Sequence, residues 1–271
     1  MPVLPCFVSP PLYISANGRI PGRHFAATII AAVLTGCSGL PPEAPLRPLP
    51  ILPAEVSRGQ SGHGCIALTF DAGGTDSGLA ELLESLQAFR VTCTFFITGT
   101  WASGHPRHVR EIAARGHEIG NHTWSHSDLT RLDGPEIQSE ISRTDLLLTA
   151  LTGRTPRPLL RAPYGARNSR VLNIASDLGY TSVYWTLDSL DSIDPPKSPP
   201  FLFNQVTSAT DADLDGSIVL MHVGEPSTAA ALPGILRNLQ SRGFRIVKIS
   251  HLPGLCSVWR PGNPQFTKRS E

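Results

Sequence analysis

The sequence predicts an α/β fold of the βα-barrel type, in which parallel strands alternate with helices. Between residues 65 and 252, short apolar runs alternate with longer segments whose apolar residues recur at helical spacing. Three of the helical segments end in a glycine directly before the next strand, at Gly116, Gly179 and Gly243, as is typical of a left-handed C-cap. The polar residues suited to chemistry follow the strands, which is where a βα barrel assembles its active site.

Periodicity and boundary residues predict the individual helices and strands. The first helix has leucines at 3–4 spacing, a second begins at Pro106, and a third carries Ile137 and Ile141 on one face and closes at Gly153. About seven strands alternating with helices imply a parallel sheet with right-handed crossovers. The predicted strands are 65–71, 91–97, 117–121, 159–161, 181–185, 217–222 and 245–249. The predicted helices are 79–89, 106–115, 135–151, 169–178 and 228–241.

Length and charge narrow the class of protein. The chain has 271 residues, of which 41% are hydrophobic and 17% charged, enough for one barrel-sized domain or two smaller ones. Its 23 basic and 22 acidic residues leave a formal charge of +1. There is no basic run or stripe, so we expect no nucleic-acid partner.

The N-terminal segment is predicted to be a targeting signal rather than part of the fold. Arg19 and Arg23 precede the apolar run 25–34, which is too short to span a bilayer and fits a signal-peptide core. The run ends in LTGC at 34–37 and resembles the bacterial lipobox, whose cysteine is lipidated. We therefore expect a signal peptide over 1–37 and an exported lipoprotein, anchored in the cell envelope through Cys37. The alternative is an ordinary secretory signal with a chance cysteine.

The remaining boundaries come from prolines and cysteines. The proline-rich stretch 38–58 is predicted to be an extended linker, followed by a globular domain over 59–256 and a tail over 257–271. An exported protein can form disulfides, and Cys65 could pair with Cys256, although sequence alone leaves the pairing open. Cys93 lies in an apolar strand and is expected to be a buried core thiol.

Two histidines four residues apart suggest a metal site. His122 and His126 lie in the stretch GNHTWSHSD at 120–128, in a loop or first helical turn after a predicted strand. Residues at i and i+4 of a helical turn share one face, with Cβ atoms about 5–6 Å apart, so both imidazoles can reach one ion. The spacing is common, and two unrelated loop histidines are the alternative. The other strand ends add further polar candidates: Asp71, Arg161, Asp188, Asp191 and His222.

Five short motifs, in order, resemble the polysaccharide deacetylases, the NodB-homology group also called carbohydrate esterase family 4. They are TFDAG at 69–73 for TFDDG, HTWSH at 122–126 for H(S/T)xxH, RAPYG at 161–165 for RxPxG, WTLDSLDS at 185–192 for WxxDxxDW, and LMH at 220–222 for LxH. The resemblance covers about residues 63 to 252. It implies a distorted (β/α)7 TIM-like barrel of the NodB type.

The resemblance also implies a role for each matched residue. His122 and His126 would be the metal ligands, and Arg161 would pair with the catalytic base. The backbone N–H of Tyr164 would face the oxyanion, and Trp185 would line the substrate groove. The catalytic set it implies is Asp71 as base, His222 as general acid, Asp191 as the carboxylate behind that histidine, and Arg161.

Two positions depart from the family pattern. Ala72 stands where the family has a metal-ligating Asp, and Ser192 stands where it has a groove-lining Trp. Catalytic zinc normally has three protein ligands plus water, and only two are evident. Asp71 could itself ligate the metal, Asp76 could reach in from the glycine-rich loop, or the metal could keep an extra water. We expect a working but altered site for a divalent cation, with zinc favoured and cobalt or another ion as alternatives.

The expected function is metal-dependent hydrolysis of N-acetyl groups from an amino-sugar polymer such as peptidoglycan, a chitin-like chain or an exopolysaccharide. The partners implied are the acetylated polysaccharide and the membrane, and we expect a monomer. One alternative is an O-acetyl polysaccharide esterase. A second alternative is a non-catalytic glycan-binding lipoprotein on a degenerate deacetylase scaffold, for which Ala72 and Ser192 are the evidence.

Overall fold

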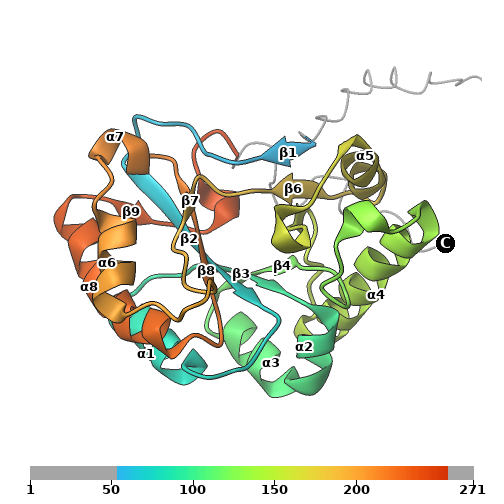
Figure 1. The fold of residues 1–271 in the computed structure, drawn as a ribbon, viewed down its shortest axis with the longest axis horizontal. Coiled ribbons are helices and arrows are strands. Elements are labelled where there is room, and N and C mark those ends of the chain that lie inside the picture. The colour runs from blue at the N-terminus through green and yellow to red at the C-terminus, as the bar shows by residue number, and fades with distance from the viewer. Residues whose placement is uncertain (1–53, 256–271) are drawn as a thin grey trace, which may run out of the picture. The chain divides into compact units, whose positions relative to one another are not determined.

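A computed structural model describes residues 54–255, which form a curled parallel sheet with helices on its outer side (Figure 1). The strands are β1 (Glu55–Val56), β2 (Cys65–Ala72), β3 (Thr94–Ile97), β4 (Glu118–Asn121), β5 (Leu159–Leu160), β6 (Thr181–Val183), β7 (Leu187–Asp188), β8 (Ile218–His222) and β9 (Arg245–Ile246). The helices are α1 (Leu79–Ala88), α2 (Gly99–Gly104), α3 (Pro106–Ala114), α4 (Gly134–Thr152), α5 (Ser169–Asp177), α6 (Pro199–Thr207), α7 (Asp211–Leu214) and α8 (Pro226–Ser241).

The strand order is β1-β6-β5-β4-β3-β2-β8-β7, with β9 paired to the start of β2, and every strand pair in this sheet is parallel. Within residues 54–255, β1 and β7 are not paired with each other, so the barrel is incomplete. This curled parallel architecture confirms the predicted distorted βα barrel.

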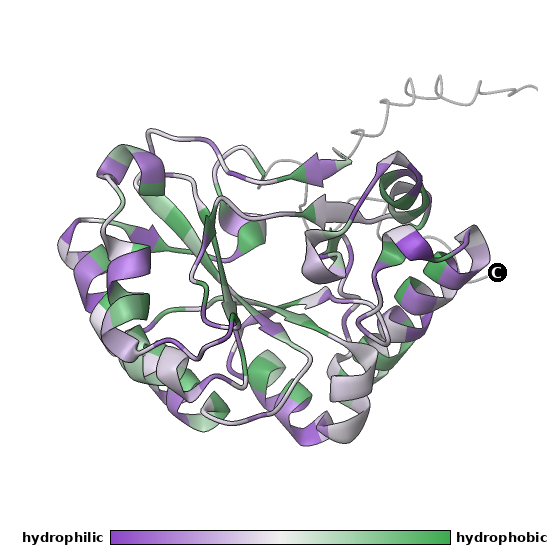
Figure 2. Cartoon of the chain, in the orientation of Figure 1, coloured by the Kyte–Doolittle hydropathy of each residue, from purple (hydrophilic) through white to green (hydrophobic). Residues whose placement is uncertain are grey.

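The two faces of β2 show how the core positions the site. Ile66, Leu68, Phe70 and Ala72 belong to the cluster between the sheet and helices such as α1 and α8. Successive residues of a strand point to opposite faces, so Thr69 and Asp71 face the inside of the curled sheet. Hydropathy colouring shows mainly apolar residues along the central strands, whereas the outer helices carry both apolar and polar residues (Figure 2). Asp71 therefore projects inward at the carboxyl end of a fully buried strand.

Most predicted elements are confirmed, and glycines end several helices as expected. Gly116, Gly179 and Gly243 have φ angles of 83°, 80° and 87°, and Gly153 ends α4 with φ 71°. At its start, α4 has a capping box: the Asp133 carboxylate accepts from the Glu136 N–H, and the Glu136 carboxylate accepts from the Asp133 N–H, each at 2.8 Å.

The structure adds elements that the sequence did not predict. These are β1, β7, α2, α6 and α7, all of which are short or begin with proline or glycine. Glu55 and Val56 fall in the predicted linker 38–58 but pair with β6, so the folded part begins before residue 59. The strand predicted over 181–185 ends at Val183.

Several predictions lie outside the described residues: the signal peptide 1–37 with Cys37, most of the linker, Cys256 and the tail 257–271. Cys93 is fully buried in the core, as predicted. Cys65 is buried and forms no disulfide with another described cysteine. No helix within residues 54–255 has the length and apolar character needed to cross a membrane.

Candidate active site

The carboxyl ends of four strands bring the predicted residues together. In the register of β2 and β8, Asp71 lies opposite His222, and the Val223 N–H donates to the Asp71 carbonyl at 2.8 Å. His122 directly follows β4 and Arg161 directly follows β5. Because these strands are parallel, the four side chains leave the sheet at one edge, as predicted.

Asp71 and Arg161 form a buried ion pair at this edge. Arg161 Nη1 donates to Asp71 Oδ1 at 2.7 Å and to the Thr69 hydroxyl at 2.8 Å. Arg161 Nε donates to the Val183 carbonyl at 3.2 Å, and the guanidinium lies 4.1 Å over the Phe96 ring centroid. With the Arg161 side chain 1% and Asp71 6% exposed, the pair is shielded from water. One carboxylate oxygen of Asp71 is thereby fixed and Oδ2 is left for other partners.

His122 presents a free lone pair beside that second oxygen. Its Nδ1 lies 2.8 Å from the Arg161 carbonyl, and a carbonyl can only accept, so we assign the ring proton to Nδ1. His122 Nε2 then faces Asp71 Oδ2 at 3.4 Å. Burial, partly offset by the Asp71 charge, lowers the pKa of His122 to about 4, so the imidazole is neutral at neutral pH. Two electron-pair donors facing each other suit a cation held between them.

His126 and Tyr164 stand beside this pair. The His122 and His126 ring centroids are 4.9 Å apart at 71°, and the Tyr164 ring packs edge-on against His126 at 4.7 Å. Burial also lowers the pKa of His126. Tyr164 has a left-handed backbone (φ 58°) and its side chain is 72% exposed, so it marks the mouth of the site. Trp185 lies nearby, with its ring 5.8 Å from the Arg161 guanidinium.

This donor set fits a divalent metal ion, for which neutral imidazoles and a carboxylate are ordinary ligands. The set is nevertheless short of a third dedicated ligand. Among residues 54–255, no group of three or more His, Cys, Asp or Glu side chains is arranged to hold a metal. Ala72 is fully buried in the apolar cluster behind the sheet and supplies no ligand.

Of the three predicted ways to complete the metal site, the structure favours ligation by Asp71 over ligation by Asp76. The Asp76 carboxylate lies 3.1 Å from His108 Nε2 and 3.8 Å from His105 Nε2, on the side of the loop that faces α3. In the structure, Asp76 therefore does not reach toward His122. Asp71 Oδ2 is the carboxylate oxygen that lies beside His122. Ser192, at the family's Trp position, is exposed.

His222 and Asp191 form the second half of the site. Asp191 Oδ1 lies 2.7 Å from His222 Nδ1, and Asp191 Oδ2 accepts from the His222 N–H at 2.8 Å and from the Thr228 hydroxyl at 2.6 Å. Burial disfavours the charged imidazole, but the hydrogen bond to Asp191 and the charges of Asp191, Asp71 and Asp188 outweigh it and raise the pKa of His222. The carboxylate behind it therefore favours the protonated ring, as a general acid requires.

Replacing Asp191 with Asn is expected to move the alkaline limb of the kcat/KM pH profile to lower pH. A general acid is lost as pH rises through its pKa, and removing the Asp191 charge lowers the pKa of His222. The matched control is Asp188→Asn, because Asp188 acts on His222 only through its charge and more weakly. The role of Asp191 would be refuted by an alkaline limb that stays in place, or by an equal shift in the control.

Sequence reasoning missed several residues that support the site. Thr69 lies in the TFDAG motif, and its hydroxyl accepts from Arg161 Nη1. Asn121 lies in the stretch GNHTWSHSD, and its Oδ1 accepts from the Thr123 N–H at 2.9 Å. Thr228 and Glu140 lie on helices. The position at a strand end is what predicts a site residue from the sequence. A residue that contacts the site from a helix has no such position and is not predicted.

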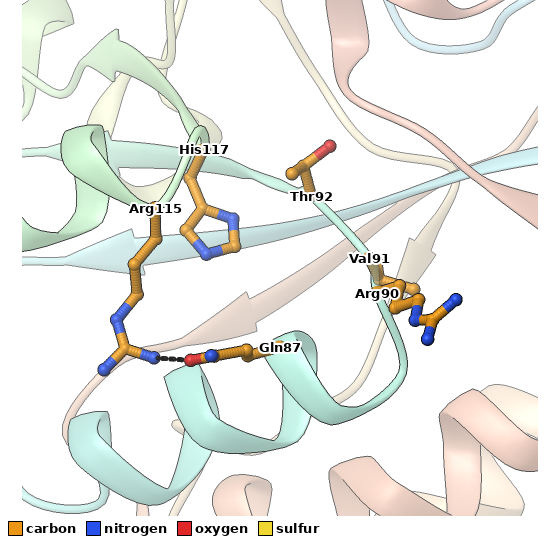
Figure 3. A pocket seen from close by; sticks show the side chains of 6 residues that line it. All are labelled: Gln87, Arg90, Val91, Thr92, Arg115 and His117. Atoms are coloured by element: carbon orange, nitrogen blue, oxygen red, sulfur yellow. Dashed lines mark hydrogen bonds between the residues drawn. The ribbon is translucent and has the colours of Figure 1, made fainter.

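A cavity of about 360 Å³ lies away from this site (Figure 3). It is lined by Gln87, Arg90, Val91, Thr92, Arg115 and His117. Val91, Thr92 and His117 precede β3 and β4, so the cavity lies at the amino ends of the strands, opposite the candidate active site. Burial, with the charges of Arg115 and Lys248, lowers the pKa of His117 to about 4. The ring is therefore neutral, as expected for a core histidine.

Comparison with known proteins decides the family. The family model described as "Polysaccharide deacetylase" matches residues 58–183. A chitooligosaccharide deacetylase of Bradyrhizobium sp. (strain ANU 289) is 32% identical over 207 residues, covering 71% of this chain and 92% of the relative. The chain belongs to the polysaccharide deacetylase family. The resemblance read from the five motifs is thus confirmed.

Two further relatives show the range within this polysaccharide deacetylase family. The peptidoglycan-N-acetylglucosamine deacetylase PgdA of Listeria monocytogenes is 33% identical over 189 residues, covering 70% of this chain but only 39% of the Listeria protein. A crystal structure of a CE4 family pseudoenzyme from Bacillus anthracis superposes with a TM-score of 0.68 at 29% identity, covering 74% of this chain and 69% of that one. The structural similarity confirms the barrel fold. The same fold therefore occurs in a protein described as a pseudoenzyme.

Proposed function

We propose that this polysaccharide deacetylase hydrolyses N-acetyl groups from an amino-sugar polymer of the bacterial envelope, using a divalent cation held by His122 and His126. Zinc is the favoured ion, because neutral imidazoles are among its usual ligands. The Listeria and Bradyrhizobium relatives, named as deacetylases of peptidoglycan and of chitooligosaccharides, support this class of substrate.

One observation carries the proposal: a carboxylate and an imidazole, suited to act as base and acid, lie on neighbouring strands at one edge of the sheet. Asp71 is the penultimate residue of β2 and His222 is the last residue of β8, and the two are in register with each other. Each has its own buried partner, Arg161 for Asp71 and Asp191 for His222. A glycan-binding protein would have no need for two proton-transfer groups that are each held by a buried partner of opposite charge.

The side chains divide the proton transfers between them. The chemistry that a divalent cation supplies, when bound to the two histidines, is polarisation of the amide carbonyl and acidification of water. Asp71 takes a proton from the attacking water at Oδ2, because Oδ1 is occupied by Arg161. His222 gives a proton to the leaving amine from Nε2, because Nδ1 is engaged by Asp191. The Tyr164 N–H is proposed as an oxyanion donor, a contact worth about 3–4 kcal/mol in other enzymes.

The function is tested by measuring acetate and new free amine from N-acetylglucosamine oligomers, peptidoglycan and acetylated xylan, with and without added zinc. We expect acetate and amine in equal amounts, dependent on the metal. Acetate without amine would instead show an O-acetyl esterase, for which His222→Ala would be less harmful because an alkoxide leaves more readily than the unprotonated nitrogen anion of an amide. Glycan binding with no acetate under any metal would show a non-catalytic protein and sink the proposal.

We also propose that the protein is an exported lipoprotein held in the membrane by a lipid on Cys37. The LTGC sequence after a short apolar run supports this. Replacing Cys37 with Ser is expected to move the protein from the membrane fraction to the soluble fraction of the envelope. Unchanged membrane association of Cys37→Ser would exclude lipid anchoring at this position.

A further inference from the structure

The loop between the two histidines has a backbone that its own sequence does not favour. Thr123 has φ 65° and His126 has φ 62°, both in the left-handed region. Non-glycine residues held there cost about 1–3 kcal/mol each and persist only where the surrounding structure over-determines them. The His122–His126 geometry therefore depends on what holds this loop.

The carbonyl groups of the loop are held from α2. The Thr123 carbonyl accepts from the Gly99 N–H at 2.9 Å, and the Trp124 carbonyl accepts from the Thr100 N–H at 3.0 Å. The Trp124 ring lies directly on Gly99, where a Cβ atom would come within 2.2 Å of the Trp124 ring. One side of the loop is thus pinned by a neighbouring backbone.

The N–H groups of the loop are held from α4 by a single carboxylate. Glu140 Oε2 accepts from the Trp124 N–H at 2.9 Å and from the Ser125 N–H at 2.8 Å. Glu140 Oε1 accepts from the Ser125 hydroxyl at 2.9 Å. Within residues 54–255 Glu140 makes no ion pair, so the hydrogen bonds of its carboxylate go to this loop. One turn further along α4, Arg143 lies 4.1 Å over the Trp124 ring.

We propose that Glu140 is a positioning residue that fixes the His122–His126 pair for divalent-cation binding, an inference that rests on the proposed function. The carboxylate joins the two residues midway between the histidines to α4, and α2 holds the opposite side. Hydrogen bonds to an ionised acceptor are about twice as strong as neutral ones. Without Glu140 two adjacent N–H groups lose their acceptor, and the loop can relax away from the left-handed conformation that brings the rings together.

The test measures zinc affinity of the full chain by competition with a chromophoric chelator, alongside the melting temperature without metal. Glu140→Ala is expected to weaken zinc binding by about 10–100-fold, the usual effect of losing an outer-shell partner. Glu140→Gln keeps an oxygen acceptor and is expected to restore part of that loss. Glu140→Asp keeps the charge but shortens the side chain, and is expected to bind zinc more weakly than Glu140→Gln.

The matched control is Glu136→Ala on the same helix, which removes the capping-box carboxylate that accepts from the Asp133 N–H. It is expected to lower the melting temperature without changing zinc affinity. Zinc binding by Glu140→Ala as tight as in the wild type, or an equal loss in Glu136→Ala, would overturn the inference. If Glu140→Ala does not fold, Glu140→Gln and Glu140→Asp decide by the same comparison. A wild type that binds no zinc overturns the proposed function and this inference together, whereas tight binding by every variant overturns only the inference.

Discussion

Asp71→Asn is expected to lower kcat/KM by about 10²–10⁴-fold at saturating zinc, the range that general-base catalysis contributes. The amide of Asn is almost isosteric with the carboxylate and can still accept from Arg161 Nη1, which now donates to Asp71 Oδ1 at 2.7 Å. The fold is therefore expected to survive, while the group that takes the proton from water is lost. The measurement is acetate release against zinc concentration.

The zinc titration separates the two roles open to Asp71. If Asp71 is only a metal ligand, Asn weakens zinc binding and added zinc restores the rate. If Asp71 is the base, activity stays low however much zinc is added, which is the result we expect. The control is Asp76→Asn: this carboxylate lies in the loop that follows β2 but pairs with His108 at 3.1 Å, so its loss is expected to leave activity unchanged. Full activity of Asp71→Asn would remove Asp71 from the mechanism.

The parts of the site that the sequence predicted are those placed by strand ends. Asp71, Arg161 and His222 each fall within one residue of a strand's carboxyl end, and parallel strands carry such residues to one edge whatever the details of packing. The barrel itself follows from the same alternation of strands and helices. Motif order then gave each residue a role that no single spacing could give.

The parts that the sequence could not predict depend on contacts between distant elements. The histidine pair was expected on a loop or a helical turn, and the structure shows a loop with left-handed residues at Thr123 and His126. The conformation of this loop is set by α2 and by Glu140. Neither is indicated by the spacing of apolar residues in the sequence. The helix α2 has only six residues and begins and ends with glycine, so 3–4 spacing cannot mark it.

Ala72 is the position where sequence and structure together change the interpretation. The sequence shows that a ligand is missing, and left three ways to complete the site. Strand alternation turns the Ala72 side chain into the apolar cluster behind β2, while Asp71 faces the histidines. The carboxylate beside the pair therefore belongs to the predicted base, so one group is placed to serve both proton transfer and the metal.

Arg161→Met is expected to lower the free energy of unfolding by about 3–5 kcal/mol, the usual cost of removing one partner from a buried ion pair. Met has a similar length and no charge, so the loss comes mainly from stranding the Asp71 carboxylate, whose side chain is 6% exposed. The hydrogen bonds from Arg161 to the Thr69 hydroxyl and the Val183 carbonyl are lost as well. Urea unfolding of the wild type and the variant measures the difference.

A double-mutant cycle with Asp71→Asn identifies the cause. If the stranded charge dominates, the second substitution removes it, and the double variant is more stable than the sum of the two single losses predicts. Strict additivity would show that Arg161 acts through packing and its other hydrogen bonds instead. The Asp71–Arg161 ion pair also orients Asp71 so that its Oδ2 faces His122 at 3.4 Å. Arg161→Met is therefore expected to weaken zinc binding too. The free energy of unfolding and the zinc affinity are then expected to fall together, because both depend on the Asp71 carboxylate that the buried Arg161 guanidinium holds in place.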